Sequence, residues 1–119
     1  MEVTIKNLEA YLAGTYGGFA EKHGVALAEN NLFMKLVEEM GEVAEVINRK
    51  TGRKADDGTD LGSELGKELC DVIHYAVAIA AVNGLDLNKI IIEKDRAAAI
   101  KYNHKINLED FIRSEEKDV

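Results

Sequence analysis

Residues 35–45 read KLVEEMGEVAE, and residues 68–71 read ELCD. If both stretches are helical, each carries carboxylates three residues apart, and each pair lies on one side of its helix. Like charges at that spacing weaken a helix by roughly a few tenths of a kcal/mol. A hard divalent cation, bound by oxygens from two facing helices, would compensate for this repulsion. The two stretches therefore predict a metal site between two helices.

The composition predicts a single, all-α domain over residues 1–119. A chain of 119 residues with 46% hydrophobic and 31% charged residues is long enough for one core and has no disordered character. It contains no proline, which favours long helices. The formal charge of −7 argues against a nucleic acid polymer as partner, because such surfaces are usually basic.

Hydrophobic spacing and capping residues predict the helices. The first covers residues 5 to about 22, where Gly14, Gly17 and Gly18 suggest a kink or a close helix contact. The later ones begin at an Asn30 or Asn31 cap, near 60–63, at an Asp86 cap and at 107–110, and the tail from 114 to 119 is expected to fray. The segment 48–63 between the second and third helices is expected to be either a lid that meets phosphate or a solvated connector.

The second and third helices carry the informative faces. The expected apolar side of the second helix consists of Leu32, Phe33, Leu36, Val37, Met40, Val43, Ala44 and Ile47. Glu39 falls at the border of that arc, where a partly buried ligand would lie. The third helix is apolar nearly all round from Val72 to Val82, which predicts burial on every side and hence a partner subunit. His74 is expected to be a core or interface histidine with a satisfied hydrogen bond, and Cys70 to pack as a small hydrophobe.

Four carboxylates form the predicted metal site: Glu39, Glu42, Glu68 and Asp71. Oxygen ligands suit Mg²⁺ or Mn²⁺, and Mg²⁺ usually binds phosphate as well, so the set indicates a phosphorylated substrate. Glu38 could take the proton of an attacking water. A lone Glu-x-x-Glu is usually solvated surface, but two such pairs on consecutive helices are much less frequent by chance.

These residues resemble a known signature. The pattern Glu38-Glu39-x-x-Glu42, followed by Glu68-x-x-Asp71, is similar to that of the MazG-like nucleoside triphosphate pyrophosphohydrolases of the all-α NTP pyrophosphatase superfamily. The resemblance covers about residues 30–102. It implies a four-helix bundle that forms a homodimer or homotetramer. It also implies Mg²⁺-dependent cleavage of a nucleotide between the α- and β-phosphates, which releases a monophosphate and pyrophosphate.

The resemblance also implies roles for individual residues. Glu39, Glu42, Glu68 and Asp71 would be metal ligands, and Glu38 the catalytic base. The candidate phosphate contacts are the basic residues Lys35, Lys94, Arg96 and Lys101. Relatives often carry an Asn between the basic residues of the fourth helix, but that position holds Ala98 here.

The same residues are also compatible with three other interpretations. Phosphoribosyl-ATP pyrophosphohydrolase shares the architecture and differs in substrate. A di-iron carboxylate bundle needs Glu-x-x-His on two helices, and this chain offers only Asp71-x-x-His74. A helical interaction module without enzymatic activity would leave the acidic residues as surface. The single cysteine, the absence of a secretory leader and the short apolar runs lead us to expect a cytoplasmic protein without a membrane span.

Overall fold

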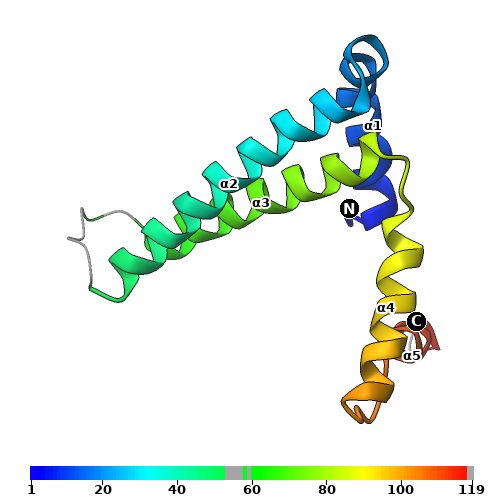
Figure 1. Ribbon diagram of the computed structural model, residues 1–119. Coiled ribbons are helices and arrows are strands. Elements are labelled where there is room, and N and C mark those ends of the chain that lie inside the picture. The colour runs from blue at the N-terminus through cyan, green and yellow to red at the C-terminus, as the bar shows by residue number, and fades with distance from the viewer. Residues whose placement is uncertain (53–57, 59, 118–119) are drawn as a thin grey trace. The chain divides into compact units, whose positions relative to one another are not determined.

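The computed structural model describes residues 1–52, 58 and 60–117. Within these residues it contains five helices and no strand (Figure 1): α1 Ile5–His23, α2 Val25–Lys50, α3 Leu61–Val82, α4 Leu87–Lys101 and α5 Leu108–Lys117. The predicted all-α class is therefore confirmed. The expected lid or connector at 48–63 includes residues 53–57 and 59, which lie outside the described residues.

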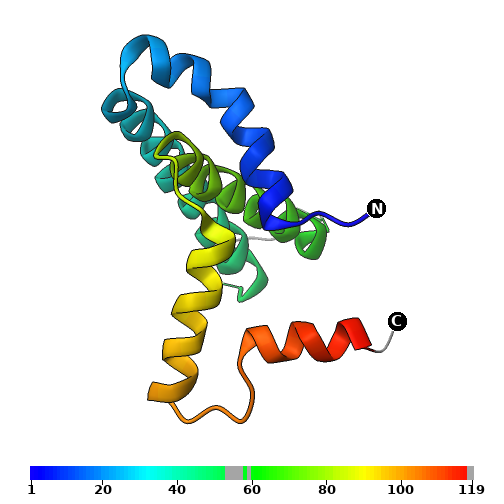
Figure 2. The ribbon, with the colours of Figure 1, turned by 90° about the vertical axis from the view of Figure 1, so that its right-hand side faces the viewer.

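The chain divides into two compact units, Met1–Leu85 and Asp86–Val119. In the first unit, α2 and α3 lie side by side and antiparallel, and α1 packs against both of them (Figures 1 and 2). The core of this unit consists of small and aliphatic side chains: Leu12, Ala20, Ala28, Leu32, Val46, Val77, Ala78 and Ala80. The predicted four-helix bundle and single domain stay predictions.

Helices α2 and α3 meet along one stripe of residues on each helix. Within each stripe the residues recur, on average, every 3.5 positions, which is the period of helices packed at a shallow angle. We call these stripes together the α2–α3 seam. On α2 the stripe includes Ala28, Leu32, Lys35, Glu39, Val46 and Arg49, and on α3 it includes Glu64, Glu68, Asp71, Tyr75 and Ala78. Its apolar members hold the helices together, since Leu32 is 5%, Val46 1% and Ala78 0% exposed.

The predicted apolar side of α2 was partly wrong. Leu32 is buried as expected, but Phe33, Val37, Met40 and Ile47 are between 44% and 55% exposed, and the unpredicted Val46 is buried. The helix carries two adjacent apolar stripes, and only one of them is covered by α1 and α3. Similarly, Ile73 in the predicted all-buried half of α3 is 50% exposed.

Caps explain where most helices begin. The carboxylate of Asp60 accepts a hydrogen bond from the Ser63 amide at 3.2 Å, and Asp86 accepts one from the Lys89 amide at 3.2 Å. Both starts were predicted. The Asn30 or Asn31 cap was wrong, because α2 already begins at Val25 and its cap position is Gly24, without a side-chain hydrogen bond. Gly24 also ends α1, and its φ of 96° is a conformation that other residues adopt only with strain.

Helix α1 runs without interruption through Gly14, Gly17 and Gly18. The expected close helix contact at these glycines is absent from the described structure, since a Cβ at each would meet no atom of a described residue within 4 Å. The three glycines are therefore not required by packing within this chain.

The second unit is a pair of helices, α4 and α5, linked by polar contacts. Asp95 accepts a hydrogen bond from the Leu108 amide at 2.6 Å, which satisfies a backbone donor at the start of α5. Arg96 pairs with Glu109 at 2.5 Å, and Glu109 also pairs with Arg113 at 3.1 Å. The expected fraying from 114 was wrong as far as Lys117, because α5 continues to that residue.

No single helix within the described residues is both long and apolar enough to cross a membrane. Only the sequences of α3 and α4 taken together reach that length and composition.

Candidate functional site

The register of the α2–α3 seam brings a carboxylate of α2 between the two helices. Glu39 follows Lys35 by one helical turn on the covered stripe and is partly buried, whereas Glu38 and Glu42 are exposed. Leu32 and Val46 lie seven residues before and after Glu39 on the same stripe, and both are buried in the core. Glu39 therefore faces α3 as they do. The predicted border position of Glu39 is therefore confirmed.

Three of the four predicted ligands converge. The carboxylates of Glu39, Glu68 and Asp71 each offer an oxygen, and these oxygens all lie within 4.8 Å of one another. We call these residues the carboxylate triad. Glu68 and Asp71 reach the same point because they are three residues apart on α3. Glu42 lies outside this group, and its predicted role as a ligand stays a prediction.

The triad is electrostatically unfavourable without a cation. The pKa of Glu39 is raised above its usual value, first by desolvation, then by a hydrogen bond with Glu68 and by the charges of Asp71, Glu68 and Glu42. A nearby divalent cation reverses this balance, because it favours the charged form of each carboxylate. The residues thus fit a metal ion: they supply only hard oxygen donors, and their mutual repulsion is what a cation would relieve.

Glu38, the predicted base, lies beside the triad on the exposed side of α2. Its carboxylate pairs with Lys35 Nζ at 3.2 Å, and both side chains are exposed. The hydrogen bond and charge of Glu38 raise the pKa of Lys35.

The other predicted phosphate contacts lie on α4, in the second compact unit. Arg96 pairs with Glu109 of α5, and Lys101 Nζ lies 5.3 Å from the centre of the Tyr102 ring. Lys94 is exposed. The roles of these three residues in phosphate binding stay predictions.

Two residues of α3 near the triad, His74 and Cys70, were also the subject of predictions. His74, one turn beyond Asp71, shares a 2.7 Å hydrogen bond between its Nε2 and the Tyr16 hydroxyl, so the predicted hydrogen-bonded histidine is confirmed. Cys70 is exposed and does not pack as predicted. Sequence patterns within α3 could not identify Tyr16 as the partner, because it comes from α1, far away along the chain.

At the far end of the seam, α2 and α3 are joined by an ion pair. Arg49 Nη2 lies 2.7 Å from Glu64 Oε1, and the side chains are only 12% and 33% exposed. This contact is consistent with the antiparallel register in which Glu39 meets Glu68 and Asp71.

The comparison with known families gives one match. The model of the MazG nucleotide pyrophosphohydrolase domain matches residues 28–99. The matched region contains the carboxylate triad, Glu38 and Glu42, and leaves the whole of α1 outside it. The match supports nucleotide pyrophosphohydrolase activity in general, in enzymes that use a divalent metal ion. No individual curated protein matches the chain.

Proposed function

This chain belongs to the MazG nucleotide pyrophosphohydrolase family, and we propose that it hydrolyses a nucleoside triphosphate between the α- and β-phosphates. The products would be a nucleoside monophosphate and pyrophosphate, and the reaction would need Mg²⁺. The observation that carries this proposal is the convergence of Glu39, Glu68 and Asp71 within 4.8 Å inside the matched region. Structural stability gives no reason to gather three like charges at a helix interface.

The triad would hold the metal ion, with Glu42 as the fourth proposed ligand. A bound Mg²⁺ supplies charge neutralisation for the phosphates and lowers the pKa of water. The triad would supply only some of the oxygen ligands that Mg²⁺ prefers, so phosphate oxygens could supply others.

Glu38 and Lys35 are the proposed residues for proton transfer and phosphate orientation. The Glu38 carboxylate is exposed, adjacent in sequence to a triad member, and therefore accessible to a water beside the bound phosphates. Lys35 is exposed as well and can exchange its Glu38 partner for a phosphate oxygen at small cost, because exposed ion pairs contribute little stability. Lys94, Arg96 and Lys101 complete the proposed phosphate contacts.

The decisive experiment is a screen of the full chain against ribo- and deoxyribonucleoside triphosphates and phosphoribosyl-ATP. Hydrolysis is followed by the release of pyrophosphate and monophosphate, with Mg²⁺, Mn²⁺ or EDTA present. We expect equal amounts of both products and no reaction in EDTA. Release of inorganic phosphate alone, or full activity in EDTA, would contradict the proposal.

Glu38 is tested separately from the ligands. In Glu38→Gln we expect kcat to fall while Mg²⁺ binding, measured by calorimetry, stays near the wild-type value. The control is Glu21→Gln, which removes an exposed carboxylate of α1 that has no proposed role. If Glu38→Gln keeps its kcat, another group accepts the proton.

We also propose that the chain works as a homodimer or homotetramer. The uncovered stripe of α2, Phe33, Val37, Met40 and Ile47, continues onto Leu69 and Ile73 of α3 as half-exposed large apolar residues. A second copy of the same antiparallel helix pair would cover such a face symmetrically. Light scattering on the purified chain should give a multiple of 13.1 kDa. Val37→Lys with Met40→Lys should shift it to the monomer, whereas a monomeric wild type would refute this proposal.

A further inference from the structure

A pocket of about 390 Å³ lies within the second compact unit, where the chain turns from α4 into α5 (Figure 2). We call residues 102–107 the elbow and this cavity the elbow pocket. Three basic side chains line it: Arg96 of α4, and His104 and Lys105 of the elbow. Most of its lining residues follow residue 99, where the family match ends. Apart from Arg96, none of them has a role in the chemistry proposed above.

Hydrogen bonds at both ends restrain the elbow. At its start, the His104 amide donates to the Ala99 carbonyl at 2.9 Å. Asn103 has a φ of 54°, so the helix ends in the left-handed cap that is common at helix C-termini. At the other end of the elbow, Asn107 Oδ1 accepts a hydrogen bond from the Asp110 amide at 2.8 Å. The walls of the elbow pocket are therefore in place before a ligand binds.

The charge of the lining is opposite to that of the chain. The whole sequence has a formal charge of −7, yet Asp110 is the one acidic residue among the described residues that line the elbow pocket. Arg96 Nη2 donates to Glu109, but Arg113 pairs with the same carboxylate at 3.1 Å, so the two arginines together retain one positive charge. A guanidinium has five N–H donors, so Arg96 keeps donors for a ligand. Together with Lys105, it makes the elbow pocket an electropositive site on an acidic chain.

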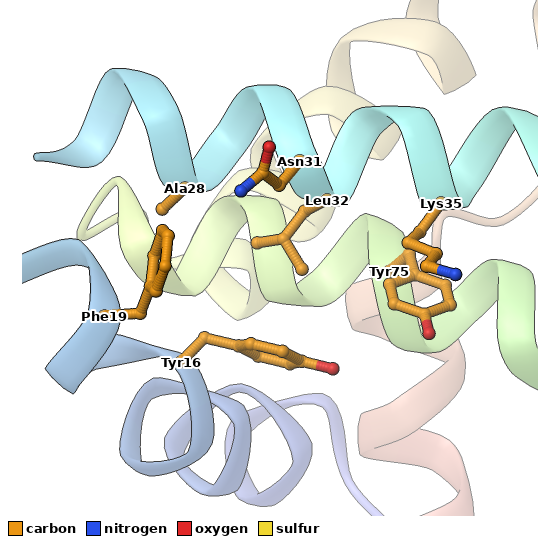
Figure 3. Close-up of a pocket in the computed structure, with 7 residues that line it drawn as sticks. All are labelled: Tyr16, Phe19, Ala28, Asn31, Leu32, Lys35 and Tyr75. Carbon is orange, nitrogen blue, oxygen red and sulfur yellow. The ribbon is translucent and has the colours of Figure 1, made fainter. Parts of the chain in front are cut away.

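The pocket between α1, α2 and α3 has walls of a different kind (Figure 3). Its volume is about 330 Å³, and aromatic and aliphatic side chains such as Tyr16, Phe19 and Leu32 dominate its lining. The elbow pocket instead combines its basic side chains with the amides of Asn103 and Asn107. Amide and basic N–H groups are the donors that phosphate oxygens accept hydrogen bonds from. The lining of the elbow pocket therefore suits a small anion better than an apolar ligand.

From these observations we propose that the elbow pocket binds a small anion of the phosphate class. Arg96, His104 and Lys105 supply the N–H donors, and Ile100 and Ile106 form the apolar part of the walls. A phosphate group fits this lining better than a carboxylate, because it carries more charge and three acceptor oxygens, which several basic side chains can share. The inference does not rest on the proposed function, since the elbow pocket needs neither a metal ion nor the triad.

Anion binding is measured on the full chain in EDTA, where the triad without a cation repels anions. Inorganic phosphate, pyrophosphate and AMP are titrated separately at constant ionic strength and followed by amide chemical shifts in NMR. We expect saturable shifts centred on residues 96–110. Binding of phosphate or pyrophosphate identifies a free anion as ligand, and binding of AMP alone identifies a phosphorylated nucleoside. Acetate, a singly charged carboxylate, is the control anion and should bind more weakly.

Two substitutions of opposite sign test the charge of the elbow pocket. Lys105→Gln removes a positive charge from the lining and should weaken anion binding about five-fold. Asp110→Asn removes the negative charge and should strengthen binding by a similar factor. The matched control is Lys89→Gln, an exposed lysine of α4 outside the elbow pocket, which should bind like the wild type. Circular dichroism checks that the helix content of all three variants is unchanged.

Several results would overturn the inference. These are the absence of saturable shifts up to high millimolar concentration, shifts centred outside residues 96–110, and acetate binding as tightly as phosphate. Equal effects of Lys105→Gln and Lys89→Gln, or weaker binding in Asp110→Asn, would do so as well. The readout is independent of hydrolysis. A chain that hydrolyses no nucleotide can still bind phosphate at the elbow, and an active chain that fails these tests loses only this inference.

Discussion

Two groups of charged residues lie where α2 packs against α3. One is an attractive ion pair, and the other is a cluster of like charges. Near the ends of the helices, Arg49 and Glu64 form a complementary pair at 2.7 Å with largely buried side chains. In the middle of the same seam, Glu39, Glu68 and Asp71 gather three like charges within 4.8 Å. The first contact stabilises the helix pair as it stands, and the second becomes favourable only when a cation joins it. The seam thus combines a complementary ion pair with a cluster of like charges.

The strongest way to test this comparison is to neutralise one member of the triad. Glu39→Gln and Asp71→Asn should each lower kcat/KM for the preferred nucleotide more than about 100-fold, since even residues that only support a metal ligand typically cost 10- to 100-fold. The fold should remain intact, as checked by circular dichroism. Glu21→Gln, an exposed carboxylate on α1, is the control. Normal activity in both triad variants would leave the acidic residues without a catalytic role.

A second variant tests whether Glu42 belongs to the proposed metal site. Glu42 lies outside the triad but its charge acts on Glu39. We expect Glu42→Gln to lower kcat/KM by about 10-fold, less than the triad variants do. A loss equal to that of Glu39→Gln would show that Glu42 becomes a full ligand when the metal is bound.

The complementary pair should affect stability and not chemistry. Arg49→Met keeps the aliphatic stem but removes the charge that faces the partly buried Glu64, and should destabilise the chain by about 1–2 kcal/mol. This corresponds to a decrease of roughly 5 °C in Tm, measured by thermal unfolding in EDTA. At a temperature well below Tm, kcat should change less than about two-fold. A large loss of activity in the folded variant would mean that the two contacts are not independent.

The smallest effect has the opposite sign. In EDTA, Glu39→Gln should unfold at a slightly higher temperature than the wild type, because it removes a partly buried charge from between two like charges. Added Mg²⁺ should raise the Tm of the wild type and leave that of the variant unchanged. At a Mg²⁺ concentration of 100 times its Kd, the free energy of unfolding of the wild type should rise by about 2.7 kcal/mol. A Glu39→Gln protein that is less stable in EDTA would show that the triad contributes to folding.

The sequence was sufficient where the deciding contacts are local. Asp60 and Asp86 cap α3 and α4 through amides three residues ahead, and both starts were predicted from those residues alone. The spacing of Glu68 and Asp71 likewise placed them on one face. The start of α2 was missed because no side chain marks it, only the backbone of Gly24.

The rest depended on which surfaces meet. The wheel of α2 offers two apolar stripes, and periodicity cannot tell that the one containing Val46 is covered and the one containing Met40 is not. The pocket between α1, α2 and α3 was not foreseen, because its walls come from three helices and Tyr16 meets His74 across 58 positions of sequence. Such contacts are set by the packing of α1, which no local pattern encodes.

Gly24 connects α1 to α2 in a backbone conformation that is unusual for other residues. A single residue ends α1 and begins α2, with φ at 96° and ψ at 146°. Every other amino acid would be strained in this conformation, so a substitution at Gly24 would alter the angle at which α1 leaves α2. Such a change would move α1 without altering a single acidic group.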